Sequence, residues 1–398
     1  MEEGLLALAD DLSGAVETAA CLRPLGRATT VELARVEASH AHNAQSVVVV
    51  DLDARALPAA EAARVAGAAL RDAHERPVFL KIDSQLRGNV AAVLGAAADR
   101  PLVVAPALPA LDRTAVGGVA HLRGVPLHRS GAWQVEDTSP PRSIAEALAP
   151  LPCRSIPLPI VRSAALRAAL AECAAAGEVA VCDGETDADL DAVVTAAPDR
   201  ARLAGSGGLA AALGRAARRS AVEAPPPPTG NPVLIVVGTA APEAAEQLNV
   251  AELRGTHVVT CRPADLLGRG TSESALSRAL GALERGPTAL SIDAAEPVPP
   301  ERSRDLVRGL ASTAAGVVGR HPGPVDLVLT GGETARLVLD ALGVRALVPV
   351  GEIHHGAVRS RTPLGASVVT RPGSFGGRDS LVRIVEHLRP AGIERLTK

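Results

Sequence analysis

The chain has 398 residues, of which 47% are hydrophobic, so it is long enough to form about two domains with buried cores. Its net charge of -3 and its lack of aromatic residues (two Phe, one Trp, no Tyr) argue against nucleic-acid binding, which uses cationic surfaces and stacking side chains. Five scattered cysteines without a CxxC pair indicate a reduced compartment and neither a zinc site nor a disulfide framework. No apolar run approaches the ~20 residues of a membrane span, so we expect a cytoplasmic protein with no membrane partner.

Short apolar runs in the first part of the chain predict the strands of a parallel α/β sheet, because most precede an Ala- and Leu-rich helical pattern. These runs are Leu5 to Ala9, Ser46 to Val50, Pro77 to Leu80 and Leu102 to Ala105. The segments that follow them are polar: Asp10 to Gly14, Asp51 to Arg55, Lys81 to Asn89 and Pro106 to Thr114. Ligands bind beyond the carboxyl ends of strands in open α/β sheets, so we expect these segments to converge on one cleft.

One lysine stands out in the third polar segment. Apart from Lys398, Lys81 is the only lysine among 41 basic residues, and the others are arginines. Such a composition suggests a site that needs a compact ammonium, as contacts to phosphate or carboxylate often do. A surface lysine retained by chance is the competing interpretation.

The acidic pair Asp10-Asp11 follows the first predicted strand, and a helix is expected to start at about Ala15. Carboxylates there can accept a hydroxyl proton or bind sugar hydroxyls. They can also complement the charge of a helix N-terminus, and both roles are compatible. His354-His355 and His40-Ala41-His42 lack a third ligand at metal spacing, so we interpret them as surface or loop histidines and predict no metal-ligating residues.

A proline run separates two parts of the chain. Pro225 to Gly230 can form neither a helix nor a central strand and is typical of a stiff connector. We therefore predict a domain over residues 1–224, a linker over 225–230 and a second domain over 231–398, each domain with a mainly parallel sheet flanked by helices.

Three predicted strands of the second domain run into glycine-rich turns. Val233 to Val237 precedes Gly238-Thr239 and a helix from about Pro242; Asp326 to Leu329 precedes Thr330 to Thr334 and a helix to Leu342; Ser367 to Val369 precedes Thr370 to Gly377. Glycines and hydroxyls at such turns let backbone N–H groups approach a phosphate. This domain is therefore predicted to bind a nucleotide.

The sequence lacks one familiar phosphate-binding motif and contains a partial match to another. A Walker A loop is excluded because no Gly-Lys-Ser/Thr occurs. Gly205 to Ala210 matches G-x-G-x-x-A, but it follows a short charged stretch, and the nearest suitably spaced acid, Glu223, adjoins the proline run. We expect a tight turn that starts a helix and closes the first domain.

Taken in order, the motifs resemble the four-carbon acid sugar kinase family. The matching segments cover nearly the whole chain: Ala9 to Ala15, Lys81 to Asn89, Pro106 to Thr114, Gly124 to Leu127, Gly205 to Ala210, Thr330 to Ala335, Gly351 to Ile353 and Thr370 to Gly376. The resemblance implies an N-terminal sugar-acid-binding domain, a C-terminal ATP-binding domain, an active site in the cleft between them, and ATP-dependent phosphorylation of threonate, erythronate or an oxo-tetronate with Mg²⁺. A homo-oligomer is left open.

The resemblance also implies roles for individual residues. The catalytic candidates are Asp10, Asp11, Lys81, Asp83 and Arg87, and the substrate-binding candidates are Asp53, Arg55, Ser84, Gly88 and Asn89. Lys81 or Arg87 would pair with the substrate carboxylate or the transferred phosphoryl group, and one of Asp10, Asp11 and Asp83 would accept the hydroxyl proton. The candidates for ATP binding are Gly238, Thr239, Thr330, Gly331, Gly332, Glu333, Thr334, Gly351, Glu352, Gly373, Ser374, Phe375 and Gly376.

The sequence departs from the family pattern at several positions. Gly238 to Ala241 lacks serines that the family often has, His354 to Ala357 replaces a Pro-Gly loop, Arg371 stands where lysine is typical, and Asp112 to Ala115 departs from Gly-Arg-Thr-Thr. Two alternatives remain at this stage: an NAD-dependent oxidoreductase that uses the Gly205 turn, and a non-catalytic protein that binds a sugar acid or nucleotide.

Overall fold

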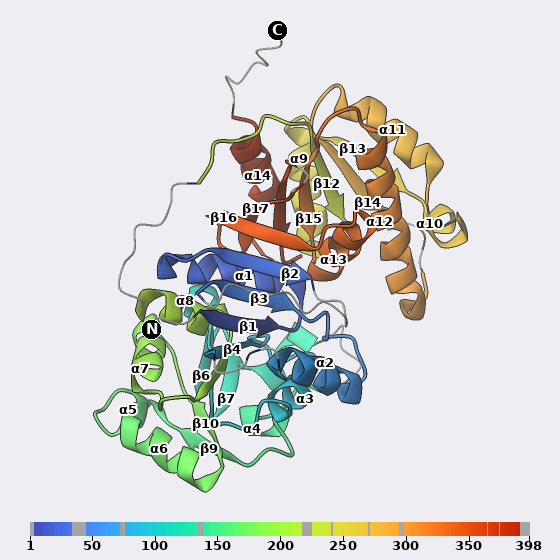
Figure 1. Cartoon of the computed structure of the whole chain (residues 1–398). Coiled ribbons are helices and arrows are strands. Elements are labelled where there is room, and N and C mark those ends of the chain that lie inside the picture. The colour runs from blue at the N-terminus through green and yellow to red at the C-terminus, as the bar shows by residue number, and fades with distance from the viewer. Residues whose placement is uncertain are drawn as a thin grey trace. The chain divides into compact units, whose positions relative to one another are not determined.

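The structure is a computed structural model that describes residues 4–33, 45–71, 73, 76–133, 138–216, 225–239, 242–269, 271–293, 296, 298–363, 365–373 and 375–390. Its internal contacts divide the chain into two compact units, Met1–Glu223 and Ala224–Lys398, and each is described by itself (Figure 1).

The first unit is built on a parallel sheet in the order β2-β3-β1-β4-β11-β5-β10-β9. Its strands are β1 (Leu5–Ala9), β2 (Thr29–Leu33), β3 (Val47–Asp51), β4 (Val78–Lys81), β5 (Leu102–Ala105), β9 (Cys153–Ile156), β10 (Val179–Cys182) and β11 (Arg202–Gly205). A small antiparallel sheet contains β6 (Arg113–Val116), β7 (Val119–Leu122) and β8 (Val125–Pro126).

Helices cover both faces of this parallel sheet. They are α1 (Leu12–Leu22), α2 (Ala59–Arg71), α3 (Val90–Gly95), α4 (Ile144–Ala147), α5 (Leu158–Val161), α6 (Leu166–Ala176), α7 (Asp187–Ala196) and α8 (Gly207–Ala216). Small residues of α2 and branched residues of α3 form one core with Leu6, Leu8 and Leu80 of the central strands. Helix α1 packs on β3 and on α8 (Figure 1). Because helices cover both faces of the sheet, the strand sequences are continuous apolar runs.

The four predicted strands of this unit match β1, β3, β4 and β5 within one residue at each end. Helix α1 begins at Leu12, earlier than expected, because the Asp11 side chain caps it by accepting a hydrogen bond from the Gly14 backbone N–H. The charged stretch before Gly205 was not among the predicted strands, but it runs into β11, which lies in the middle of the sheet. Its Arg202 is buried because the guanidinium donates to the carbonyl oxygen of Ala97 and pairs with Asp99.

The second unit has a mixed sheet in the order β13-β14-β12-β15-β18-β17-β16, parallel up to β18 and antiparallel beyond it. Its strands are β12 (Val233–Val237), β13 (His257–Cys261), β14 (Thr288–Ile292), β15 (Asp326–Thr330), β16 (Ala346–His354), β17 (Ala357–Arg361) and β18 (Ser367–Arg371). Its helices are α9 (Pro242–Leu253), α10 (Pro263–Arg269), α11 (Glu273–Leu283), α12 (Ser303–Arg320), α13 (Gly332–Ala341) and α14 (Ser380–Leu388). Helices α9 and α14 pack together on one face, and α12 contacts α10, α11 and α13 (Figure 1).

The proline run has no regular secondary structure over residues 225–230. It is held to the second unit because Arg359 of β17 donates hydrogen bonds to the carbonyl oxygens of Pro226 and Pro227. Among the described residues, no helix has the length and hydrophobicity to span a membrane.

Candidate functional site

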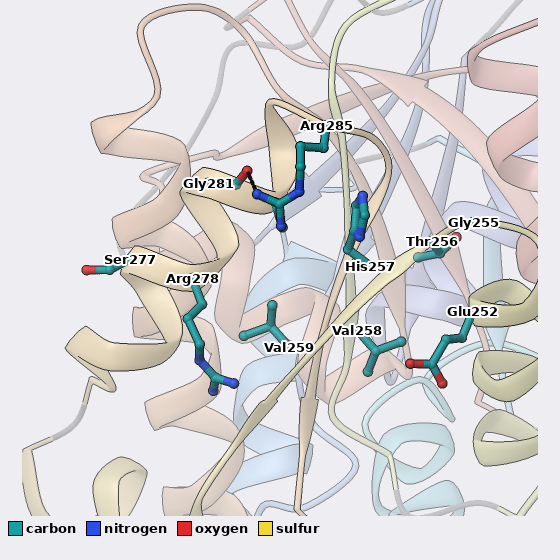
Figure 2. A pocket seen from close by; sticks show the side chains of 11 residues that line it. Glu252, Gly255, Thr256, His257, Val258, Val259, Ser277, Arg278, Gly281 and Arg285 are labelled. Atoms are coloured by element: carbon teal, nitrogen blue, oxygen red, sulfur yellow. Dashed lines mark hydrogen bonds between the residues drawn. The ribbon is translucent and has the colours of Figure 1, made fainter.

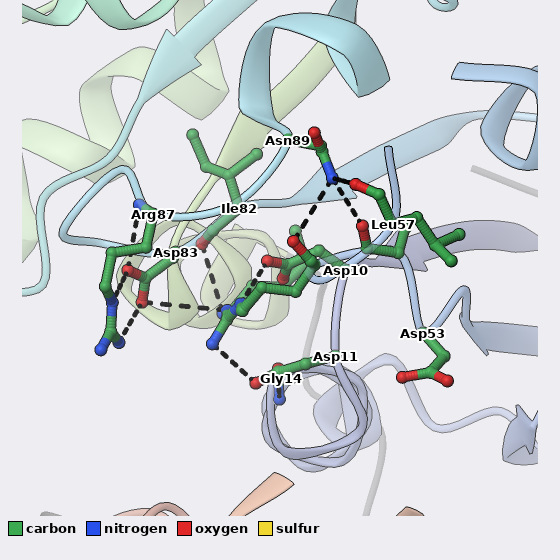
Figure 3. A network of polar contacts seen from close by, with 12 residues as sticks. Asp10, Asp11, Gly14, Asp53, Leu57, Ile82, Asp83, Arg87 and Asn89 are labelled. Atoms are coloured by element: carbon green, nitrogen blue, oxygen red, sulfur yellow. Dashed lines mark hydrogen bonds and ion pairs between the residues drawn. The ribbon is translucent and has the colours of Figure 1, made fainter. Parts of the chain in front are cut away.

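Charged side chains meet at the carboxyl ends of β1, β3 and β4 in the first unit (Figure 3). Arg55, from the loop after β3, connects them. Its Nε lies 2.8 Å from Asp10 Oδ2, its Nη1 2.9 Å from Asp11 Oδ2 and its Nη2 4.0 Å from Asp83 Oδ1. The structure therefore brings together the residues after three separate strands, as the convergence of parallel strand ends requires.

Both carboxylate oxygens of Asp83 accept hydrogen bonds from Arg87. Arg87 donates from Nε to Oδ2 at 2.7 Å and from Nη2 to Oδ1 at 3.1 Å, so both carboxylate oxygens are occupied. Burial alone would raise the pKa of Asp83, but Arg87 and Arg55 outweigh burial and hold the pKa well below the ordinary value of 3.8. Asp83 is thus an anion that positions two arginines.

Asp10 is in a different state. Its Oδ2 accepts from Arg55, whereas its Oδ1 is buried and has no hydrogen-bond partner among the described residues. Burial raises the pKa of Asp10, and although Arg55 opposes this, the pKa stays above its ordinary value of 3.8. A carboxylate with a free lone pair and a raised pKa is suited to accept a proton.

Asp11 combines the two roles that the sequence left open. Its Oδ1 accepts a hydrogen bond of 2.7 Å from the Gly14 N–H, which caps α1, and its Oδ2 pairs with Arg55. Both oxygens are therefore engaged within the unit.

Lys81 is buried, with 6% of its side chain exposed, so it is not a chance surface lysine. Its Nζ lies 3.6 Å from Glu17 Oε2 and donates to the Ile82 carbonyl oxygen at 3.3 Å. Burial lowers the pKa of Lys81, but Glu17 and the aspartates of the cluster outweigh it, and the net pKa is raised. Glu17 was not predicted from the sequence as a site residue. It could have been noticed because it is the only charged residue in α1.

The other substrate-binding candidates mostly shape the loops. Asn89 Nδ2 donates to the carbonyl oxygens of Ala54 and Leu57, so it ties the loop after β4 to the loop after β3. Gly88 has φ +78, and a Cβ there would lie 3.0 Å from Arg55 Cγ, so glycine is required.

Two further side chains bound the cluster. Ser84 Oγ accepts a hydrogen bond of 2.6 Å from Arg113 Nη1 of β6, a residue of the fourth polar segment. Asp53 lies apart from the contacts drawn in Figure 3, on the far side from Arg87.

In the second unit, three glycine turns meet at the carboxyl ends of β12, β15 and β18. A Cβ at Gly238 would overlap Thr334, one at Gly373 would lie 2.8 Å from Thr239 Oγ1, and one at Gly331 would lie 3.7 Å from Thr239 Cβ. At Gly238 and Gly373 the turns therefore approach each other more closely than a side chain would permit, and at Gly331 they are in ordinary van der Waals contact. Thr330 Oγ1 is buried here without a hydrogen-bond partner among the described residues, as expected where a ligand completes the contacts.

The remaining nucleotide candidates lie around these turns. Gly332 and Glu333 start α13, and Glu333 lies 3.4 Å from Arg304. Gly351 and Glu352 belong to β16, where Glu352 Oε1 accepts the Gly356 N–H at 2.6 Å.

The ring of Phe375 stacks on His355, with 5.9 Å between ring centroids. A Cβ at Gly376 would lie 2.7 Å from Ser380 Oγ. His354 was expected at the surface or in a loop, but it ends β16, is partly buried and hydrogen-bonds to Ser380 Oγ. Ser374, His40 and His42 lie outside the described residues.

The glycines of the Gly205 turn are explained by close packing, because side chains there would overlap neighbouring atoms. A Cβ at Gly205 would lie 2.5 Å from the Ala105 carbonyl oxygen, one at Gly208 2.5 Å from that of Ala107, and one at Gly207 2.5 Å from Glu17 Oε1. The Gly208 N–H donates to Ser206 Oγ instead of facing a ligand. The turn thus joins β11 to α8 in close contact with neighbouring segments.

A shallow pocket of about 640 Å³ lies elsewhere in the second unit, beside the edge strand β13 and α11 (Figure 2). Its lining includes Thr256 and His257 at the start of β13, away from the glycine turns, together with Arg278 of α11 and Arg285, which follows that helix. Arg278 Nη2 donates a hydrogen bond to the Thr260 carbonyl oxygen, and Arg285 Nη1 donates one to the Gly281 carbonyl oxygen.

The donor sets fit a nucleotide better than a protein-caged metal. Within the described residues, no group of three or more His, Cys, Asp and Glu side chains could hold a metal ion. Backbone N–H groups at glycine turns, the buried hydroxyl of Thr330 and a helix N-terminus at Gly332 are the groups that phosphate oxygens require.

Comparison with known proteins agrees with this division. A family model described as a sugar-binding N-terminal domain matches residues 5–213, and one described as a nucleotide-binding C-terminal domain matches residues 234–381. The chain is 34% identical to a D-threonate kinase of Cupriavidus necator, over 94% of this chain and 96% of the relative. It is 31% identical to a D-threonate kinase of Bordetella bronchiseptica, over 96% of each protein, and 30% identical to a 3-oxo-tetronate kinase of Methylobacterium radiotolerans, over 97% and 99%.

Solved structures share the fold. A Haemophilus influenzae protein, 19% identical, superposes with a TM-score of 0.72 over 96% of this chain and all of its own. A Salmonella typhimurium protein, 23% identical, does so with a TM-score of 0.76 over 96% and 98%. The two domain matches and the near full-length relatives show that the chain belongs to the four-carbon acid sugar kinase family, with a sugar-binding N-terminal and a nucleotide-binding C-terminal domain.

Proposed function

We propose that this protein is an ATP-dependent kinase that phosphorylates a hydroxyl group of a four-carbon sugar acid, of the threonate, erythronate or 3-oxo-tetronate type. Near full-length relatives named D-threonate kinase and 3-oxo-tetronate kinase support the reaction class. The observation that carries the proposal is the buried cluster of carboxylates and cations at the strand ends of the unit that matches the sugar-binding model.

The cluster offers complementary groups to such a substrate. Carboxylates accept hydrogen bonds from sugar hydroxyls, and Arg87, Arg55 and Lys81 provide positive charge for a substrate carboxylate. The side chains of Arg55 and Arg87 are 28% and 25% exposed, whereas that of Lys81 is 6% exposed beside Glu17. Arg55 links the three aspartates of the cluster, so we assign the substrate carboxylate to Arg87, which keeps its orientation through Asp83.

Asp10 is the proposed general base. Its unpartnered Oδ1 and raised pKa distinguish it from Asp83, whose oxygens are both bound to Arg87, and from Asp11, whose oxygens cap α1 and bind Arg55. A substrate hydroxyl donating to Oδ1 would satisfy this buried atom, and its proton would pass there as the oxygen attacks.

The nucleotide is assigned to the glycine turns of the second unit. The N–H groups at Gly238 and Gly373 and the start of α13 would bind the phosphates of ATP, which supplies the transferred phosphoryl group. Mg²⁺ commonly binds such phosphates with few protein ligands, which suits a chain whose described residues form no carboxylate cage. An active site formed between the two domains stays a prediction, as do the domain boundaries and the oligomeric state.

A substrate screen tests the proposal. Purified protein with Mg²⁺ and ATP is incubated with D-threonate, D-erythronate or 3-oxo-tetronates, and ADP and phosphorylated product are both quantified. Threitol, which lacks the carboxylate, is the matched control, and we expect at least one acid to be used about 100-fold more efficiently. Ligand binding without any phosphorylated product would favour the non-catalytic alternative, and stabilisation by NAD but not ATP would favour the oxidoreductase.

A further inference from the structure

Arg371, the last residue of β18, is a fully buried arginine with unmet hydrogen-bonding capacity. Its side chain is 0% exposed. Nη2 donates to the carbonyl oxygen of Phe375 at 2.5 Å and lies 3.4 Å from that of Gly373. Nε and Nη1 are buried without a hydrogen-bond partner among the described residues. An arginine in this state is rare because guanidinium donors are usually satisfied in a protein interior.

Arg359 of the neighbouring strand β17 shows that this sheet can satisfy a buried guanidinium. Arg359 is 2% exposed, and each of its nitrogens donates: Nε to Ser367 Oγ at 3.0 Å, Nη1 to the Pro226 carbonyl oxygen at 2.8 Å and Nη2 to that of Pro227 at 2.9 Å. The unmet donors of Arg371 are therefore specific to its position.

The charge of Arg371 is also uncompensated. No carboxylate of the described residues forms an ion pair with it, and burial lowers its pKa to about 10 with no opposing neighbour. The side chain is still a cation at neutral pH. Burying a lone cation is unfavourable, and an anion that binds nearby reduces this cost.

The location of Arg371 indicates which anion that is. Its register partner on β15 is Thr330, whose buried hydroxyl likewise has no partner among the described residues. Paired residues of adjacent parallel strands project to the same face. The Gly331 N–H donates to the Arg371 carbonyl oxygen at 2.9 Å, and the Gly373 turn that the guanidinium contacts abuts Thr239. The unmet donors thus lie beneath the three glycine turns assigned to phosphate.

We propose that Arg371 is a positioning residue for the nucleotide: its guanidinium holds Gly373 and Phe375 through their carbonyl oxygens and places a buried positive charge beneath the bound phosphates. This inference rests on the proposed function, because it assumes that a nucleotide binds at these turns. It predicts that Arg371 determines affinity for phosphate charge and leaves sugar-acid binding unaffected.

The test uses Arg371→Met in the full chain, which keeps an unbranched side chain and removes the charge. Isothermal titration measures the Kd for ADP, and steady-state kinetics give the KM for ATP and for the sugar acid. We expect both nucleotide constants to rise about tenfold or more, the KM for the sugar acid to change less than about twofold, and Arg371→Lys to recover part of the loss. A purely structural arginine would not produce this separation between the two substrates.

Arg359→Met is the matched control, because it removes an equally buried guanidinium from the adjacent strand. It should lower the unfolding temperature without changing the Kd for ADP. If Arg371→Met does not fold, Arg371→Gln, which keeps a donor for the Phe375 carbonyl oxygen but no charge, is judged by the same criterion.

The outcomes separate the two claims. Wild-type affinity for ADP in a folded Arg371→Met or Arg371→Gln variant would overturn this inference and leave the proposed function intact. Absence of ADP and ATP binding by the wild-type protein would overturn the proposed function, and this inference with it.

Discussion

Asp10 and Asp83 share Arg55 yet differ in what their second oxygens contact. Asp83 is held on both oxygens by Arg87, whereas Oδ1 of Asp10 has no partner among the described residues. The pKa of Asp83 is accordingly held low, and that of Asp10 is raised by burial. The two carboxylates are thus suited to different roles, anchoring and proton transfer.

Asp10→Asn tests the second role. The amide cannot accept the hydroxyl proton as a base, so kcat should fall about 100-fold or more, with less change in the KM for the sugar acid. Steady-state kinetics measure both. Asp189→Asn is the control, because Asp189 is an equally buried carboxylate that caps α7 and pairs with Arg162. Equal losses of kcat in the two variants would contradict the assignment of Asp10.

Asp83→Asn tests the anchoring role through its pH dependence. Because the folded-state pKa of Asp83 lies below its ordinary value of 3.8, its ionisation stabilises the fold above that pH. The stabilisation is lost as the pH falls from 3.8 towards the folded-state pKa. Urea unfolding should therefore show the variant less stable by about 3 kcal/mol at pH 7, with a smaller difference below pH 3.8. A difference that does not change with pH would exclude this electrostatic role.

Lys81→Arg tests why lysine is retained in an arginine-rich chain. A Cβ at Gly14 would lie only 3.0 Å from Lys81 Nζ, so the wider guanidinium must displace α1 or the cluster. We expect a loss of about 1 to 3 kcal/mol of stability and a fall in turnover of about 10- to 100-fold. Urea titration and kinetics on the same preparations measure the two effects. A variant with wild-type values for both would show that lysine is not required.

At the scale of elements, the strands of the predicted cleft could be derived from sequence because buried parallel strands are continuous apolar runs. β1, β5 and β12 match the expected ranges. β11 was not recognised because the salt bridge that buries Arg202 involves Asp99, about a hundred residues away. The antiparallel β16 and β17 were not predicted either, since the pairing of β17 with β18 and of β16 with β17 is a tertiary feature.

The charged cluster of the first unit could also be predicted in part, because it follows from the order of strands and polar segments. The polar residues after β1, β3 and β4 converge because parallel strand ends do. The sequence could not choose among the three aspartates, because the choice depends on which oxygens arginines occupy. The contacts of Arg371 and Glu17 were hidden for the same reason, as each is defined by neighbours from other elements.

Gly331→Ala tests the turn between β15 and α13. Gly331 has φ +96, and a Cβ would extend between Thr334 and Thr239. We expect a loss of about 1 to 2 kcal/mol of stability from the left-handed backbone and a KM for ATP raised about tenfold. Gly343→Ala is the control, because Gly343 follows the other end of α13 with φ +71 and open space around it. A similar KM for ATP in both variants would remove this turn from the nucleotide site.

At the scale of the whole molecule, each unit carries a separate half of the proposed chemistry. The first has a charged cluster suited to a hydroxylated acid, and the second has glycine turns suited to phosphate. Neither half transfers a phosphoryl group alone, because transfer requires the acceptor hydroxyl to meet the phosphoryl group in line. The activity should therefore depend on both sets of residues.

The most direct test is the fate of one phosphoryl group. Wild-type protein is mixed with limiting ATP, Mg²⁺ and excess D-threonate, and ADP and the phosphorylated acid are quantified by mass spectrometry, with the other tetronates run in parallel. We predict one phosphorylated acid per ADP for at least one tetronate, and neither product when the acid is omitted. Release of ADP without a phosphorylated acid, or no ADP with any tetronate, would contradict the assignment of this protein as a sugar-acid kinase.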